Sequence, residues 1–217
     1  MKKSQIIPTV LVKSKSAYIN KIKLYEQSFN LAQIDVLNDS YIKGKSYHCS
    51  KTTNKLKTKL KFEVHLMINN PLRFIKRWKT IDKIKRFIVH VETVTVDDFE
   101  LIKKELKGIG INLALAISPG TKLSLLKSFE GKFSYLLVMG VIPGRNGAPF
   151  LVTTYSRIKK IKKMFPKVLI GVDGGVSDKN SSKLIDSGAS RLNTGSFLAG
   201  FEDMNEAVSK LVKTIGK

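Results

Sequence analysis

The stretch KVLIGVDGGVSDKNSSKLIDSGASRLNTGS, residues 167–196, decides the fold class of this chain. Its apolar run at 168–172 has the length of a buried strand, and the carboxylate and two glycines that follow favour a tight turn. Ser177 or Asp178 is then placed to cap a helix, and Gly188 is placed to end it. Strand, glycine turn and helix in this order are typical of an α/β fold.

The same stretch carries two glycine turns at the ends of consecutive predicted strands. Gly174-Gly175 follows the first strand, and Gly195-Ser196 follows a short strand at residues 191–194. Backbone N–H groups in such turns can bind a phosphate, and the dipole of a following helix favours the same anion. Asp173 stands directly beside this predicted phosphate site, so the sequence predicts a carboxylate next to a bound anion.

Short apolar runs alternate with amphipathic helical stretches along the whole chain. Eight strands that alternate with helices indicate a parallel sheet, and for 217 residues a single (β/α)8 barrel over residues 1–217 is the most economical closure. A doubly wound open sheet is the alternative, but no G-x-G-x-x-G motif follows the first strand. The predicted strands are 6–11, 31–37, 62–67, 87–91, 111–117, 135–141, 168–172 and 191–194, and the clearest helices are 16–29, 96–106, 153–165 and 204–215.

The composition indicates a globular protein of a reducing compartment. The hydrophobic fraction is 42%, and Cys49 is the only cysteine, which excludes an intramolecular disulfide. Residues 1–16 place lysines before an apolar run, as a signal peptide does, but the run is short, contains Pro8 and meets further lysines. No apolar segment approaches transmembrane length. We predict a cytoplasmic protein without a membrane partner.

The net charge of +22 is high enough to raise the question of nucleic-acid binding. The 39 basic residues comprise 33 lysines and 6 arginines, whereas base and phosphate recognition favours the guanidinium group of arginine. The densest runs, residues 51–61 and 159–163, are interleaved with apolar residues where helices are expected. Solvated outer helix faces explain these runs, so we do not expect a nucleic-acid partner.

Polar residues gather at the carboxyl ends of the predicted strands, where barrel enzymes place their chemistry. Gln33 and Asp35 are two residues apart in one strand and therefore share a face, and His65 lies close to the end of the next strand. Thr9 lies in the first strand, and residues 139–150 form a Pro- and Gly-rich loop long enough for a flexible lid. Together with Asp173, these residues predict two carboxylates, an imidazole and an amide around one centre.

Each of these residues also has a structural interpretation. A histidine in a strand is often a hydrogen-bonded core residue, and an aspartate before two glycines can merely shape a turn. Asp35 is harder to explain in this way, because a buried carboxylate is costly unless it is paired or bound to metal. We interpret His90 and His48 as structural, and Arg145 as either a ligand for an anion or a solvated side chain.

Motifs along nearly the whole chain resemble those of the ribulose-phosphate 3-epimerase family, (β/α)8 enzymes that invert C3 of a pentulose 5-phosphate. In chain order they are IPTVLV, QIDVLNDSYI, EVHLMINNP, IVHVET, AISPGTKL, MGVIPGRNGAPF, GVDGGV and GASRLNTGS. The ordered set is specific, because related phosphate-binding barrels share the DGG and GS turns but lack VHLM together with the loop pattern.

The resemblance implies a role for each residue. Asp35 and Asp173 match two aspartates, one of which removes the C3 proton to give an enediolate while the other returns a proton to the opposite face. Together with His65 and Gln33 they match a site for a divalent metal ion (Zn, Fe, Mn or Mg) that stabilises the enediolate as a Lewis acid. The residues that match the sugar-phosphate site are Thr9, Gly144, Arg145, Asn146, Gly147, Gly174, Gly175, Gly195 and Ser196.

The chain departs from the family pattern at the metal site and in the loop. Gln33 replaces a metal-binding histidine, which weakens the site for zinc-like metals and favours harder ions, or abolishes it. Arg145 replaces an aromatic residue, and residues 146–148 read Asn-Gly-Ala instead of Gly-Gly-Gln. The expected reaction converts D-ribulose 5-phosphate into D-xylulose 5-phosphate. The alternatives are a related ketohexose-6-phosphate 3-epimerase and a catalytically degenerate barrel that binds phosphate or a polyanion. A homo-oligomer remains open.

Overall fold

The strands follow one another in chain order around a closed barrel, as predicted. In the computed structural model, which describes residues 4–144 and 147–215, this order is β1 through β8. The doubly wound open sheet is therefore excluded. The described chain packs as two compact units, Thr9–Leu115 on the one hand and residues 4–8, 116–144 and 147–215 on the other.

The strands match their predicted positions closely. They are β1 (Gln5–Val10), β2 (Leu31–Leu37), β3 (Lys61–Met67), β4 (Ile84–His90), β5 (Asn112–Ile117), β6 (Tyr135–Met139), β7 (Leu169–Asp173) and β8 (Arg191–Thr194). The helices are α1 (Lys15–Tyr25), α2 (Ser50–Lys55), α3 (Pro71–Trp78), α4 (Val96–Glu105), α5 (Thr153–Met164), α6 (Ser181–Asp186), α7 (Ser196–Ala199) and α8 (Met204–Ile215), with a 3-10 helix at Leu123–Phe129.

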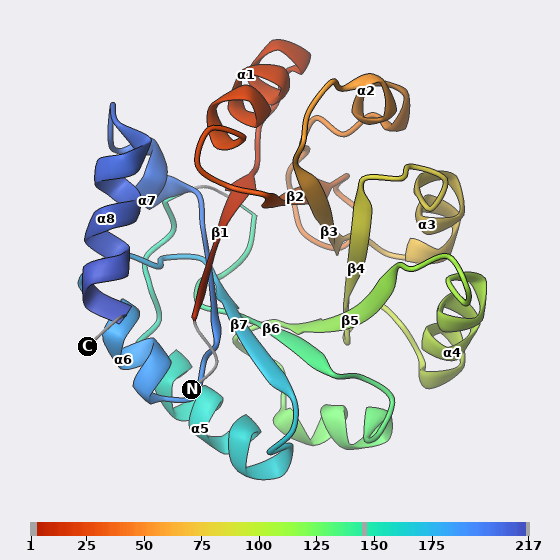
Figure 1. The fold of residues 1–217 in the computed structure, drawn as a ribbon. Coiled ribbons are helices and arrows are strands. Elements are labelled where there is room, and N and C mark those ends of the chain that lie inside the picture. Colours follow the sequence, from red (N-terminus) through yellow and green to blue (C-terminus); the bar gives the residue numbers. More distant parts are fainter. Residues whose placement is uncertain (1–3, 145–146, 216–217) are drawn as a thin grey trace. The chain divides into compact units, whose positions relative to one another are not determined.

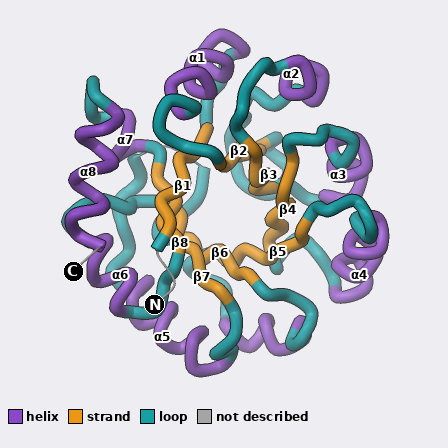
Figure 2. Tube along the Cα trace, viewed as in Figure 1, coloured by secondary structure: helices purple, strands orange, loops and turns teal. Residues whose placement is uncertain are grey.

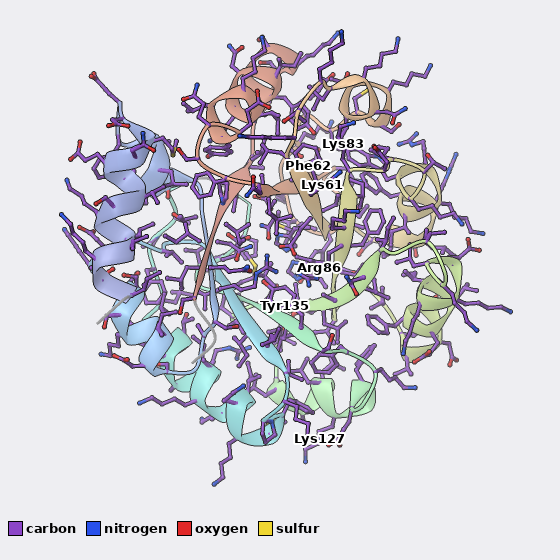
Figure 3. The ribbon with its side chains drawn as sticks, viewed as in Figure 1. Lys61, Phe62, Lys83, Arg86, Lys127 and Tyr135 are labelled. Carbon is purple, nitrogen blue, oxygen red and sulfur yellow. The ribbon has the colours of Figure 1, made fainter. Side chains whose placement is uncertain are left out.

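In the unit Thr9–Leu115, strands β2, β3 and β4 pair in parallel, and helices α2, α3 and α4 lie outside them (Figure 1). The register places Asp35 opposite His65 on the neighbouring strand. Phe62 of β3 is fully buried, and Arg86 of β4 forms an ion pair with the buried Glu63; Figure 3 labels Phe62 and Arg86. This register fixes which side chains of β2 and β3 meet.

Local sequence signals explain why the helices of this unit begin where they do. Helix α4 begins after Thr95, whose side chain accepts a hydrogen bond from the backbone of Asp98, while the Asp98 carboxylate accepts one from the backbone of Thr95. Helix α3 begins at Pro71, which suits a first helical position because its missing N–H is not needed there. At its other end, the fully buried Trp78 stacks on Phe74.

In the second unit, β6, β7 and β8 pair in parallel, and β8 also pairs with Gln5 to Pro8 of β1. Helices α5, α6 and α8 follow one another alongside β7 and β8 (Figure 2). The predicted cap of the helix after β7 was wrong. Helix α6 begins only at Ser181, and its N-cap is Asn180, because a turn occupies residues 178–180 where the helix was expected to start. Gly188 follows the end of α6 with a positive φ of 111°, as predicted.

The dense lysine runs lie on solvent-exposed helix and loop surfaces. Lys51, Lys55 and Lys57 are exposed in and after α2, and Lys159 and Lys160 are exposed on α5. This agrees with solvated outer faces as the explanation of the positive charge. Within the described residues, every helix is too short or too polar to cross a bilayer.

Candidate active site

Strands β2 and β3 bring three of the predicted site residues into direct contact. Gln33 and His65 are fully buried, and Asp35 is 5% exposed. The amide Nε2 of Gln33 donates to Oδ1 of Asp35 at 2.7 Å, and Nδ1 of His65 lies 3.1 Å from the same oxygen. The contact arises because β2 alternates its side chains and because the register places Asp35 beside His65. A buried carboxylate is thus held between an amide and an imidazole.

His90 extends this cluster, although the sequence favoured a purely structural role for it. Its Nε2 lies 2.9 Å from Nε2 of His65, and its Nδ1 lies 3.2 Å from Oε2 of Glu92. The ring of Tyr41 packs against His90 with a centroid separation of 5.1 Å. Glu92 is two residues after His90 but lies in the turn that follows β4, so strand alternation does not place its side chain and no pattern in the sequence reveals this contact.

Groups around Asp35 respond to its charge and to burial. Burial raises the pKa of Tyr25, and the Asp35 carboxylate raises it further. Burial lowers the pKa of Lys21, and the Asp35 carboxylate opposes that change. Tyr25 donates its hydroxyl hydrogen to the backbone carbonyl of Thr9, which pairs with Gln33 in the β1–β2 register. Thr9 therefore lies beside the cluster, on the strand next to β2.

His48, the remaining histidine of the sequence, has a simpler environment. His48, interpreted as structural, contacts Ser46 through Nδ1 at 3.4 Å and packs against the ring of Phe74. Burial lowers the pKa of His48. These contacts agree with the structural interpretation.

Asp173 lies in the second compact unit, at the end of β7, where it is 7% exposed. Its backbone carbonyl accepts a hydrogen bond from the N–H of Gly140 at 2.7 Å, which ties the end of β7 to the end of β6. In the register, Asp173 stands opposite Met139 on β6 and Asn193 on β8. The carboxylate is therefore presented from a backbone that is fixed on both sides.

The turn after Asp173 requires glycine at both positions. Gly174 and Gly175 have φ values of 96° and 67°, in the left-handed region. A Cβ on Gly174 would lie 2.4 Å from Cγ2 of Val141, and one on Gly175 would lie 2.8 Å from Cβ of Phe150. The loop that follows β6 thus packs directly on the bare backbone of this turn.

The turns after β7 and β8 are adjacent, as the sequence predicted. The hydroxyl of Thr194, at the end of β8, donates to the carbonyl of Val176 at 3.1 Å. Asn180 holds the first turn closed, because its Nδ2 donates to the carbonyl of Gly175 and its Oδ1 accepts from the N–H of Ser177. Gly195 is the N-cap of the one-turn helix α7, whose first residue is Ser196.

The predicted lid is described only in part. Gly144 and Gly147 have φ values of 124° and 72°, which glycine adopts without strain. Ala148 is buried, and Leu151 donates its N–H to the carbonyl of Gly140. Arg145 and Asn146 lie outside the described residues.

Comparisons with known proteins identify the family to which the chain belongs. The model of the ribulose-phosphate 3-epimerase family matches residues 5–199. The ribulose-phosphate 3-epimerase of Methanocaldococcus jannaschii is 29% identical over 195 residues, covering 87% of this chain and 81% of that protein. The Bacillus subtilis enzyme of the same name is 26% identical over 214 residues, covering 95% and 97%.

A solved structure supports the fold. The 3-keto-L-gulonate-6-phosphate decarboxylase of Vibrio cholerae superposes with a TM-score of 0.75 at 10% identity, covering all of this chain and 98% of that one. At this identity the likeness concerns the fold only. The match over residues 5–199 includes every strand and the residues of both glycine turns. The chain therefore belongs to the ribulose-phosphate 3-epimerase family, a family of carbohydrate isomerases.

Proposed function

We propose that this protein is an epimerase that inverts C3 of a pentulose 5-phosphate, interconverting D-ribulose 5-phosphate and D-xylulose 5-phosphate. The observation that carries the proposal is the buried Asp35 carboxylate, held at the end of β2 by Gln33 and His65. Burying a charged carboxylate costs free energy, and such groups are concentrated at functional sites. The family match over residues 5–199 supplies the reaction class.

In the proposed mechanism, Asp35 and Asp173 serve as the acid–base pair. One carboxylate removes the proton from C3, and the other, protonated, delivers a proton to the opposite face of the enediolate. Burial suits this task, because it keeps bulk water away from the enediolate and from the transferred proton. Gln33 keeps Asp35 in place, since its amide N–H donates to Oδ1 of that carboxylate at 2.7 Å.

The residues also fit a divalent metal ion, which would act as a Lewis acid toward the substrate oxygens. Asp35, His65 and Asp173 are all buried and offer carboxylate oxygens and an imidazole nitrogen, the usual donors for such ions. In Gln33 it is the amide nitrogen that faces Asp35, so this residue would ligate a metal through Oε1 only with its amide turned over. We propose Asp35, His65 and Asp173 as metal ligands. That Gln33 is a fourth ligand, and that the ion is Zn, Fe, Mn or Mg, are predictions to test.

The phosphate of the substrate is proposed to bind the glycine turns. The turn at Gly174-Gly175 and the turn at Gly195-Ser196 are adjacent, and backbone N–H groups of glycine turns are suited to bind a phosphate. Gly144 and Gly147 would cover the anion from the loop after β6, and Thr9 would line the sugar. Arg145 and Asn146, which lie outside the described residues, stay predicted ligands of the substrate. A single domain over residues 1–217 and a cytoplasmic location stay predictions, as does a homo-oligomer.

The proposal is tested by a coupled assay with D-ribulose 5-phosphate, run with and without a chelator. We expect Asp35→Asn and Asp173→Asn each to lower kcat by about 10²- to 10⁴-fold, the usual contribution of a general acid or base. Asp97→Asn, which makes the same charge change at an exposed position on α4, serves as the control and should leave kcat unchanged.

The outcome also separates the alternatives. Turnover of a ketohexose 6-phosphate in place of D-ribulose 5-phosphate would identify the related epimerase. Absence of turnover with either sugar and with each of the four metals would overturn the enzymatic proposal and leave a phosphate-binding barrel.

A further inference from the structure

A continuous row of four polar side chains crosses the unit Thr9–Leu115. It runs from Asp35 to His65 (3.1 Å), from His65 to His90 (2.9 Å) and from His90 to Glu92 (3.2 Å). The two imidazole planes differ by 20°, and their centroids are 5.0 Å apart. Because the nearest nitrogens are much closer than the centroids, the rings meet nitrogen to nitrogen rather than face to face. This geometry suits a hydrogen bond between the rings.

The protons in this row can be counted. A neutral imidazole has one N–H and one lone pair, and an ionised carboxylate only accepts hydrogen bonds. Two neutral histidines between two carboxylates therefore bring two protons to three contacts. One contact must be left with two facing acceptors, and it lies at Asp35, between the rings, or at Glu92. Facing acceptors in a buried site are costly, so that contact favours a further donor or a cation. A second proton on one histidine or a metal ion would serve, and at Asp35 the amide of Gln33 also approaches, with Nε2 3.5 Å from Nδ1 of His65.

Glu92 decides which contact is left without a proton. Its side chain is 16% exposed, while those of His65 and His90 are fully buried, so Glu92 is the end of the row nearest to solvent. If the carboxylate of Glu92 takes the Nδ1–H of His90, then Nε2 of His90 accepts the Nε2–H of His65. The lone pair of His65 Nδ1 then points at Asp35. The unprotonated Nδ1 of His65 and the carboxylate oxygen, 3.1 Å apart, are then two ligand atoms suited to bind one cation.

We propose that His90 and Glu92 are positioning residues that keep the proton of His65 on Nε2, so that Nδ1 and Asp35 together bind a divalent metal ion. This inference rests on the proposed function, because it assigns the tautomer of one of its proposed metal ligands. Tyr41 contributes by packing on the ring of His90 and limiting its rotation. Neither His90 nor Glu92 touches the metal or the substrate in this scheme.

Metal affinity of the metal-free protein, measured by calorimetry with Zn²⁺ and Mn²⁺, tests the proposal without an activity assay. Removing a partner that orients a metal-binding histidine costs about 10- to 100-fold in affinity. We expect Glu92→Gln to fall at the lower end of this range, since its amide can still accept the N–H of His90. Glu92→Asp keeps the carboxylate and should stay closer to the parent protein, and Asp97→Asn is the charge-matched control.

Two substitutions of His90 separate the hydrogen bond from simple packing. His90→Gln offers an amide oxygen near the position of Nε2 and should retain part of the metal affinity. His90→Phe keeps a planar ring against Tyr41 but has no acceptor for His65, and should lose most of it. Circular dichroism shows whether each variant folds. Should His90→Phe fail to fold, the comparison of Glu92→Gln with Glu92→Asp still decides the question.

Nitrogen NMR of the zinc-loaded protein reads the tautomer directly, and the chain contains only three histidines. We expect His65 with its proton on Nε2 and zinc on Nδ1, and His90 with its proton on Nδ1. A proton on Nδ1 of His65, or unchanged metal affinity in Glu92→Gln and His90→Phe, would overturn the proposal.

Turnover measured in the same samples keeps this inference distinct from the proposed function. If the parent protein binds metal and epimerises D-ribulose 5-phosphate while the variants bind metal equally well, only the inference is wrong. If metal affinity falls in the variants as expected but no sugar is turned over, the inference stands and the proposed function is wrong. A parent protein that binds no divalent metal would overturn the inference.

Discussion

Gly174 illustrates how strongly a single residue constrains the site. Its φ of 96° and the 2.4 Å approach that a Cβ would make to Val141 are separate obstacles to any side chain. Substitution at this position therefore combines backbone strain with overpacking, and it does so next to Asp173.

Gly174→Ala tests these two costs against a matched variant. Gly131 has a φ of 74° in the same compact unit, but a Cβ there would meet nothing within 4 Å. We expect Gly131→Ala to lower the free energy of unfolding by about 1–2 kcal/mol, the cost of a left-handed backbone for alanine. Gly174→Ala should lose about 1–3 kcal/mol more, because the overlap with Val141 adds an overpacking cost. Urea denaturation measures both values, and equal losses would contradict the steric explanation.

The residues of the site differ in how far the sequence reveals them. Gln33 and Asp35 could be placed on one face, since they lie two apart in a clear strand, and the glycine turns could be recognised from their residue types. The contact of His65 with His90 could not be predicted, because it depends on the register of β3 and β4 and on the ring orientations, which no local pattern encodes.

At the level of elements, helix α4 shows a boundary that the sequence encodes fully. Thr95, Asp97 and Asp98 at its start and Lys103 and Lys104 in its last turn match the caps and the dipole of a helix, and the predicted start at residue 96 is confirmed. The start of β4 was predicted three residues late, at 87 instead of Ile84. The reason is physical: Lys85 and Arg86 interrupt the apolar pattern, and Arg86 forms an ion pair with the buried Glu63 within the sheet.

The capping box of α4 leads to a prediction with a defined pH dependence. Thr95→Ala should lower the free energy of unfolding by about 1 kcal/mol at neutral pH, as loss of an N-cap hydroxyl usually does. The pKa of Asp98 is lowered chiefly by the hydrogen bond from the backbone N–H of Thr95, and to a smaller extent by the hydrogen bond from the Thr95 hydroxyl. A lowered folded-state pKa gives stability that is present above the unfolded pKa, about 3.9, and is lost as the pH falls through the folded value.

The parent protein should therefore lose the contribution of this box in acid. Thr95→Ala already lacks the part of this stabilisation that comes from the hydrogen bond between the Thr95 hydroxyl and the Asp98 carboxylate. The difference in free energy of unfolding between the two proteins should therefore shrink as the pH falls below about 4. Thermal denaturation at several pH values measures this difference. A gap that stays constant into acid would show that the cap does not depend on the Asp98 carboxylate.

At the level of the whole molecule, the charge of +22 affects how an anionic substrate arrives. Summed positive charge attracts an anion over distances that salt screens, with a Debye length of about 8 Å at physiological ionic strength. We expect kcat/KM for the sugar phosphate to fall as salt rises while kcat stays nearly constant, since the attraction acts on encounter rather than on proton transfer. Initial rates measured in rising sodium chloride test this, and a kcat/KM independent of salt would contradict it.

The buried stack of Trp78 on Phe74 gives the molecule a built-in optical reporter. Trp78 is the sole tryptophan of the sequence, and it belongs to the unit Thr9–Leu115. Intrinsic fluorescence excited at the indole band therefore follows the melting of that unit, whereas far-ultraviolet circular dichroism follows the helices of both. If the two signals change at the same denaturant concentration, the halves of the barrel unfold as one cooperative domain. If they separate, the chain carries two folding units within one barrel, and the order of the transitions identifies which yields first.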